Sequence, residues 1–397
     1  MRPVFFFPRT TVLDCGASRT TLAVFSAGRA GHLRLERFAT VSHAVEPGQE
    51  GRWLEKTAEA LQVLRDRVAA TGSVTVILPP HVTLMKMFST PRVKAAKRDK
   101  IINFESQQSI PYPLNEVVWD RLIIGENSHS FNVLLCAAKL EVVDPLCTAI
   151  TAAGLTPSVL LPSVLALVTG FRQGRPAPGT PLLLVNIGAR STTLALLNKA
   201  SFQARSLSLG GNSVTQSIAE EKSCEWARAE ELKVSADRES ETASAARLFA
   251  SRLAQEIVRT LVHFREPSAA ESPLGVMLTG GAARLPGLSG LLATQLNLPV
   301  SLLSQNGSVE VGCEVGDFRR EDHGAALGEL AGGSVNAGQE RKRCLQSSAA
   351  ASALSGRSAP ASTLAGHGRG PGDGGTGSSH RASAQATPRR SRTKRGA

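Results

Sequence analysis

Short apolar runs alternate with polar and charged stretches along most of this chain, and their periods predict strands mixed with helices. Three closely spaced apolar runs between residues 11 and 45 predict strands, and apolar residues at helical spacing predict a helix over 53–69. Further strands are predicted at 73–78, 82–88, 117–124, 131–138 and 201–209, and further helices at 93–110, 140–153, 214–221, 227–234, 248–264 and 323–331. This alternation predicts an α/β fold.

One short pattern occurs twice. Residues 13–25 and 185–197 align without a gap, and each is an apolar run, a turn centred on Gly16 or Gly188, and a second β-rich run. Each copy predicts a β-hairpin, because glycine permits backbone shapes that other residues resist. A tight turn of small residues can also point backbone N–H groups at an anion, usually a phosphate. The repeat therefore predicts a duplicated domain that holds one ligand between its halves.

The basic charge of the chain is concentrated at its C-terminal end. The 397 residues carry a formal charge of +12, yet residues 334–397 alone hold eleven Lys or Arg and two acidic residues. This segment is rich in Ser, Ala, Gly, Pro and Arg, so we expect it to be disordered, since it lacks the apolar residues needed to offset ordering. Such a segment could bind nucleic acid or anionic lipid through its positive charge, or it could be a solvated tail with no partner. Its composition would also arise from out-of-frame translation of GC-rich DNA. No sequence-specific nucleic-acid binding is expected.

The cysteines do not predict a metal site or a disulfide framework. The six are scattered without a CxxC motif or paired histidines. We therefore expect reduced thiols and a cytoplasmic location.

Further glycine motifs follow the second hairpin. Gly210-Gly211-Asn212 ends a predicted strand, and Gly280-Gly281 joins a strand to a helix. Two glycine hairpins followed by these turns resemble the actin-like ATPase superfamily. That resemblance implies a two-lobed α/β fold in which the hairpins enclose the nucleotide phosphates and the late Gly-Gly turn lies against adenosine.

Within that superfamily the chain resembles the PilM family of type IV pilus assembly proteins. Three local matches carry the likeness: residues 104–117, in which a helix ends before Pro111 and Pro113; residues 133–143; and residues 207–212 together with 229–233. The resemblance covers residues 11–333. It implies actin-like lobe I over 1–72 with 155–180 returning to it, an inserted strand-helix-strand-strand (SHS2-like) subdomain over 73–154, lobe II over 181–333, and the tail 334–397.

The resemblance also implies a site for ATP and Mg²⁺. Asp14 would lie near the water shell of the metal ion. The residues expected to line the nucleotide are Gly16, Ala17, Ser18 and Arg19 in the first loop, Gly188, Ala189 and Arg190 in the second, Asn212, Glu230 and Lys233 at the ribose and base, and Gly280, Gly281 and Leu285 at adenosine. From the residues alone, Glu230 and Lys233 could equally be an exposed helical charge pair.

Asn186 departs from the superfamily pattern, in which the second hairpin opens with Asp. Asn accepts a hydrogen bond but carries no charge to hold Mg²⁺ or polarise a water molecule. No catalytic residue is assigned. The chain is expected to be a nucleotide-binding scaffold and at most a slow ATPase.

The family resemblance implies a partner as well. The N-terminal cytoplasmic tail of a PilN-like inner-membrane protein would bind beside the inserted subdomain, with Phe104, Ile110, Tyr112 and Leu114 as contact residues. Other pilus platform proteins would join the assembly, and the chain would reach the inner membrane through its partner. A related type II secretion system, a sugar or acetate-type kinase and an FtsA-like division protein are the alternatives.

Overall fold

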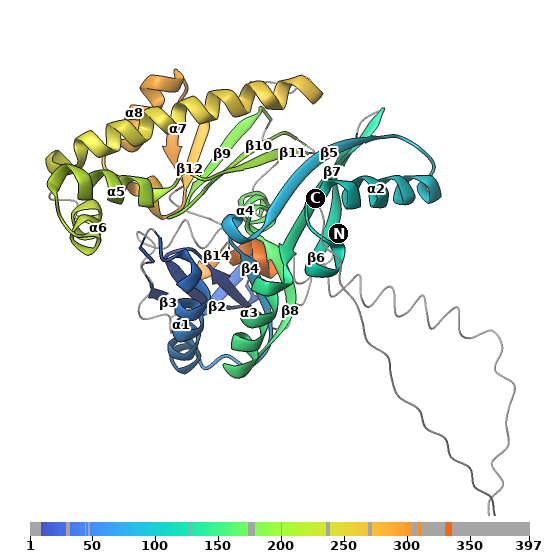
Figure 1. The fold of residues 1–397 in the computed structure, drawn as a ribbon. Coiled ribbons are helices and arrows are strands. Elements are labelled where there is room, and N and C mark those ends of the chain that lie inside the picture. Colours follow the sequence, from blue (N-terminus) through green and yellow to red (C-terminus); the bar gives the residue numbers. More distant parts are fainter. Residues whose placement is uncertain are drawn as a thin grey trace, which may run out of the picture. The chain divides into compact units, whose positions relative to one another are not determined.

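The structure is a computed structural model. It describes residues 9–28, 32–43, 45–46, 48–126, 129–173, 179–199, 201–235, 239–268, 272–303, 309–311 and 330–335. Three sheets organise these residues: one has six strands in the order β14-β3-β2-β1-β4-β8, one has five in the order β11-β10-β9-β12-β13, and one has three in the order β5-β7-β6 (Figure 1).

The six-stranded sheet is covered on both faces. It contains β1 (Thr10–Cys15), β2 (Arg19–Ala27), β3 (Leu33–Ser42), β4 (Gly72–Leu78), β8 (Leu155–Pro162) and β14 (Val309–Val311). Alternate residues of a strand point to opposite faces. Leu13 therefore packs with helices α1 (Trp53–Val68) and α3 (Leu140–Ala152), while its neighbour Val12 packs with α4 (Ser163–Arg172) and residues 330–331.

The five-stranded sheet is the core of the second half. It contains β9 (Leu182–Ile187), β10 (Thr192–Leu197), β11 (Phe202–Leu207), β12 (Val276–Thr279) and β13 (Val300–Leu302). One face packs against the helices α5 (Gly211–Lys222), α6 (Trp226–Val234), α7 (Glu239–Ser268) and α8 (Leu288–Leu296). The other face meets α4 and the three-stranded sheet. Helix α4 thus contributes side chains to the cores of both halves.

The three-stranded sheet has the expected strand-helix-strand-strand order: β5 (Leu84–Pro91), α2 (Ala95–Ser109), β6 (Val117–Glu126) and β7 (Ser130–Lys139). These elements span residues 84–139, a shorter range than the 73–154 expected for the subdomain. Strand β4 pairs in parallel with β1 in the six-stranded sheet, and α3 packs on that sheet with α1. Strand β4 belongs to the six-stranded sheet because its buried apolar run suits a central strand. The separate sheet is therefore limited to residues 84–139.

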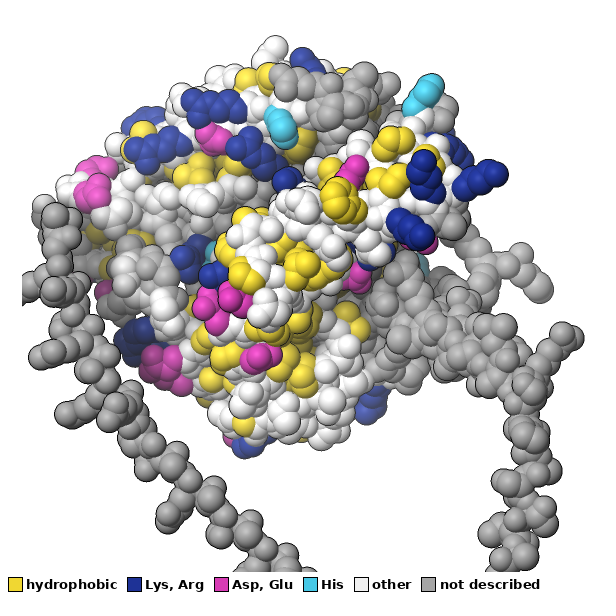
Figure 2. Space-filling view, turned by 45° about the vertical axis from the view of Figure 1, so that its right-hand side comes forward, with side chains coloured by type: hydrophobic (Ala, Val, Ile, Leu, Met, Phe, Trp, Pro, Cys, Tyr) yellow, Lys and Arg dark blue, Asp and Glu magenta, His cyan; other side chains and the backbone are white. Residues whose placement is uncertain are grey.

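The packed body extends slightly beyond residue 333, where the sequence suggested that the tail begins. Residues 330–335 are helical, and Leu330, Ala331 and Ser334 are almost fully buried. Residues 336–397 of the expected tail, and residues 323–329 of the expected last helix, lie outside the described residues. Figure 2 shows both basic and acidic side chains on one face of the molecule.

Helix α7 is longer than predicted, with 30 residues instead of the 17 of 248–264. Its first turns bury Thr242, Ala245 and Ala246, whose small side chains give a weak hydrophobic period. Among the described helices, none combines the length and the apolar character needed to cross a membrane.

Candidate functional site

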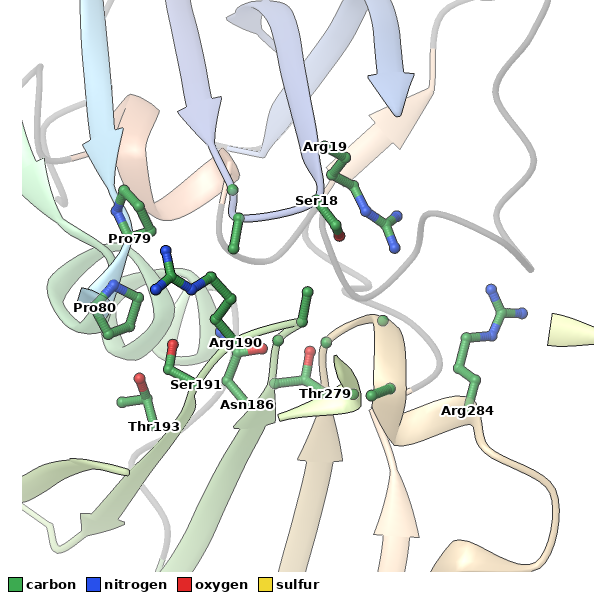
Figure 3. A pocket seen from close by; sticks show the side chains of 18 of the residues that line it. Ser18, Arg19, Pro79, Pro80, Asn186, Arg190, Ser191, Thr193, Thr279 and Arg284 are labelled. Carbon is green, nitrogen blue, oxygen red and sulfur yellow. The ribbon is translucent and has the colours of Figure 1, made fainter. Parts of the chain in front are cut away.

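The two repeated segments form hairpins with the same register. Asp14 lies opposite Thr21 in the first, and Asn186 lies opposite Thr193 in the second. The last paired residues are Cys15 with Thr20 and Ile187 with Thr192, which leaves Gly16–Arg19 and Gly188–Ser191 between them. Figure 3 shows both turns at the edge of the same opening. The repeat seen in the sequence is therefore a repeat in structure.

A cavity of about 570 Å³ lies between these hairpins. All of the expected nucleotide-binding residues except Asn212 line it: Asp14, Gly16, Ala17, Ser18, Arg19, Gly188, Ala189, Arg190, Glu230, Lys233, Gly280, Gly281 and Leu285. A cavity of this size falls within the range of small-molecule and cofactor sites. The sequence motifs, which come from both halves of the chain, therefore converge on one cavity.

Asn212 supports the second hairpin. Its backbone N–H donates to the carbonyl oxygen of Ala189 at 2.8 Å, and that of Gly211 donates to Gly188 at 2.9 Å. A Cβ atom on Gly210 would lie 2.5 Å from the Ala189 carbonyl oxygen, so a larger residue would displace the hairpin. The first backbone N–H groups of α5 are therefore bonded to the second hairpin turn, and it is this turn that lines the cavity.

The late Gly-Gly turn also depends on glycine. Gly280 has a φ of +90°, a conformation that L side chains rarely adopt, and a Cβ atom there would collide with Asn186 and the Ile187 carbonyl. Glycine therefore lets this turn approach the second hairpin closely, and the turn forms a third side of the cavity.

Glu230 and Lys233 are not a solvated charge pair. Lys233 Nζ lies 2.6 Å from Glu230 Oε2 and 2.8 Å from Thr215 Oγ1, and its side chain is only 9% exposed. Burial lowers the pKa of Lys233, Arg19 lowers it further, and Glu230 opposes both effects. This network joins α6 to the first turns of α5 at the cavity wall.

Asp14 has an unusual ionisation. Burial raises its pKa from 3.8 to about 6, and the positive charge of Arg19 opposes the rise. The described residues contain no cluster of three or more His, Cys, Asp or Glu that could hold a metal ion. One carboxylate at a phosphate site still suits Mg²⁺, which keeps several water molecules and takes few protein ligands beside the phosphates of its substrate.

Sequence reasoning missed His81 in the cavity wall. Its ring lies 5.3 Å from that of Trp53 in an edge-to-face contact, and Trp53 Nε1 donates to the Gly16 carbonyl oxygen at 2.9 Å. Neither ring nitrogen of His81 has a hydrogen-bond partner among the described residues, and both are buried. Burial lowers the pKa of His81 to about 4, and the charge of Arg190 adds to the effect, so the ring is neutral at pH 7.

The sequence feature that could have pointed to His81 is the Pro79-Pro80 pair, which ends the buried strand just before it. Strand β4 lies beside β1, so its end reaches the same edge of the sheet as Asp14. Figure 3 shows Arg190 extending toward Pro79 and Pro80. The other unpredicted lining residues are Ser163, Ser191, Thr193, Gly211, Val234, Thr279, Ala282, Arg284 and Pro286.

The expected partner residues divide into two groups. Phe104 is 64% exposed, Tyr112 39% and Leu114 41%, so each is available to a partner. Ile110, in contrast, is only 7% exposed, and its side chain packs with Val117, Leu135 and Ala137. The backbone of Ile110 is extended, directly after α2 ends.

Comparisons with known proteins agree with this fold. A family model described as type IV pilus assembly protein PilM matches residues 12–325. No curated protein shows significant sequence similarity to the chain. A solved PilM-PilN type IV pilus biogenesis complex is similar at 26% identity and a TM-score of 0.70, covering 85% of this chain and 99% of that one.

Two further structures are more distant. The ethanolamine utilization protein EutJ from Carboxydothermus hydrogenoformans aligns at 14% identity and a TM-score of 0.50, covering 83% of this chain and 91% of that one. MreB 5 of Spiroplasma citri bound to AMPPNP aligns at 13% identity and a TM-score of 0.45, over 86% of this chain and 98% of that one. The expected actin-like α/β fold is confirmed. The matched family model and the architecture agree, and the chain belongs to the type IV pilus assembly protein PilM family.

Proposed function

We propose that the chain is an ATP-binding scaffold of the type IV pilus assembly platform at the inner membrane, and at most a slow ATPase. The observation that carries the nucleotide part is the convergence of two hairpins in equal register, with the Gly280 turn, on one cavity. Turns of small residues cradle phosphates through backbone N–H groups. Asp14 would hold Mg²⁺ through the water shell of the ion, and the ion would supply positive charge to offset that of the phosphates.

The residues of the cavity favour binding over fast hydrolysis. Asn186 occupies the position equivalent to Asp14 and carries no charge. His81 is neutral at pH 7, and a base whose pKa is about 4 accepts a proton weakly. Burial raises the pKa of the Asp14 carboxyl to about 6. This arrangement suits a protein that binds a nucleotide without hydrolysing it rapidly.

The partner we propose is the cytoplasmic N-terminal tail of a PilN-like membrane protein, through which the chain would reach the cytoplasmic face of the inner membrane. The similar solved structure is a complex of PilM with PilN. Phe104, Tyr112 and Leu114 offer exposed apolar surface at and beyond the end of α2. The Tyr112 ring lies 5.0 Å from Lys139 Nζ, which holds one face of the ring against a cation.

Strand β6 begins three residues after Leu114. It pairs with β7 alone in the described sheet, and its Val118 and Ile123 are 37% and 38% exposed. An extended peptide can pair with such a strand edge while its side chains enter neighbouring apolar pockets. We therefore propose that the tail pairs with the edge of β6 and that its side chains contact Phe104, Tyr112 and Leu114. Other pilus platform proteins would join through that membrane partner.

Fluorescence anisotropy with a labelled PilN-like N-terminal peptide tests this site. Phe104→Ala and Tyr112→Ala should each weaken binding by about 1–3 kcal/mol, as buried aromatic anchors do. Leu248→Ala is the matched control, since Leu248 is also exposed, at 44%, but lies on α7. If both aromatic variants stay folded by circular dichroism and bind like the parent, the peptide site lies elsewhere.

A further inference from the structure

Arg19 belongs to the first hairpin but reaches the second half of the chain. A Cβ atom on Gly281 would lie 2.6 Å from Arg19 Nη2, so the guanidinium group rests on the bare backbone of the Gly280–Gly281 turn. The same charge opposes the rise in the pKa of Asp14 and lowers the pKa of Lys233. Arg19 therefore stands among groups from both sides of the cavity.

The second hairpin has its arginine at a different turn position. Arg190 aligns with Ser18, and Ser191 aligns with Arg19. Arg190 extends in the opposite sense, toward Pro79 and Pro80, and its charge lowers the pKa of His81 (Figure 3). Each hairpin thus directs one guanidinium group at the half that does not carry it.

The cavity has more positive than negative side chains. Arg19, Arg190, Lys233 and Arg284 line it with two acids, Asp14 and Glu230. Glu230 already accepts hydrogen bonds from Lys233 and Thr215. The positive charges of Arg19 and Lys233 oppose each other, and a multiply charged anion lying between them would remove that repulsion.

We propose that Arg19 makes the site selective for a polyphosphorylated nucleotide over a nucleoside or monophosphate, by joining the first hairpin to the Gly281 turn through the phosphates. This inference rests on the proposed nucleotide function. Guanidinium groups bind phosphate oxygens in a two-pronged geometry that lysine cannot reproduce. Gly281 has no side chain, so the guanidinium group of Arg19 can lie directly against the backbone of this turn.

The test is a titration series with adenosine, AMP, ADP and ATP in the presence of Mg²⁺, on the full chain and on Arg19→Gln, Arg19→Lys and Arg67→Gln. Arg67 is an exposed arginine in the last turn of α1, away from the cavity, and controls for the lost charge. Arg19→Gln should lose about 10- to 100-fold in affinity for ADP and ATP, with adenosine changed by less than about threefold. Arg19→Lys should fall between, and Arg67→Gln should behave like the parent.

The outcomes separate the two proposals. If the parent binds ATP and Arg19→Gln keeps the parental ratio of ATP to adenosine affinity, the selectivity inference is wrong while the nucleotide proposal stands. An equal loss for adenosine and ATP would likewise contradict it, because that pattern reflects a distorted cavity. If Arg19→Gln does not fold, Arg19→Lys decides by the same ratio. A parent that binds none of the four ligands overturns the proposed function itself.

Discussion

Gly188→Asp isolates the role of the second hairpin. A Cβ atom at Gly188 would lie 3.1 Å from the Ser191 carbonyl oxygen, which is tight but open to a small shift, and Gly188 is not among the glycines with positive φ. The hairpin should therefore fold with either Asn or Asp at this position. The two substitutions differ in charge and hardly in size, so their difference reports electrostatics.

The magnitude follows from Coulomb's law. A carboxylate about 4 Å from one phosphate charge costs roughly 4 kcal/mol at an effective dielectric constant of ~20. Since about 1.4 kcal/mol is a factor of ten, Gly188→Asp should weaken ATP binding about a thousandfold relative to Gly188→Asn. The charge of Arg190 in the same turn is screened by solvent at the open cavity and should recover only part of this loss.

Isothermal titration with ATP and Mg²⁺ measures both constants, with circular dichroism as the folding control. Adenosine provides an internal check, because its affinity should be nearly the same in the two variants. Equal ATP affinities in folded Gly188→Asp and Gly188→Asn proteins would refute the placement of phosphate at this hairpin.

Four other changes test separate parts of the account. Asn186→Asp should raise Mg²⁺-dependent ATP hydrolysis, measured by phosphate release, because it restores the charge that Asp14 has in the first hairpin; an unchanged rate would locate the limit elsewhere. Because burial raises the pKa of Asp14 from 3.8 to about 6, this carboxyl favours the folded state below pH 4 and loses that contribution as the pH rises through 6. Asp14→Asn should thus stabilise the ligand-free protein by about 1–3 kcal/mol at pH 8 and hardly at pH 3.5, and equal denaturation midpoints for both proteins at pH 8 would contradict this. Gly280→Ala should destabilise by about 1–3 kcal/mol in urea denaturation, since its φ is +90°, and a neutral result would mean that the turn relaxes freely. Removing 336–397 should change the free energy of unfolding by less than about 1 kcal/mol, whereas removing 330–397 should cost several, because residues 330–331 are fully buried; similar melting temperatures for the two truncations would refute this.

The sequence predicted the fold because its signals are local and repeated. Each hairpin needs only an apolar run, a glycine turn and a second run, and both copies kept the same register. Strand-helix-strand-strand order in the third sheet was also readable, since Pro111 and Pro113 stop α2 and Gly125 lies near the following turn. The family resemblance then predicted how the two hairpins and the late Gly-Gly turn are arranged around one site.

The features that the sequence did not predict depend on pairing between segments that are distant in the chain. The period of β4 predicts a strand but not its neighbour, so its place beside β1 could not be read from residues 73–78. His81 enters the cavity through that same pairing. For Lys233, the residues alone left a buried position and an exposed helical charge pair equally open, because its contact with Thr215 comes from α5, which the α6 pattern does not contain.

Ile110 and α7 show the limit of composition. From the sequence, apolar residues beside prolines could line a peptide-binding groove or belong to the hydrophobic core. Ile110 packs against Leu135 and Ala137 of β7 and therefore belongs to the core. The first turns of α7 are buried through alanine and threonine, which contribute little to a hydrophobic period. In each case the deciding contact is made by residues far away in sequence.

The most direct test of the account is a crystal structure of the full chain with Mg²⁺ and a non-hydrolysable ATP analogue. The account predicts phosphates between Gly16–Arg19 and Gly188–Arg190, the base beside Glu230 and Lys233, and the guanidinium of Arg19 on a phosphate oxygen. Analogue bound outside this cavity, or a cavity that stays empty at saturating analogue, would contradict the central claim.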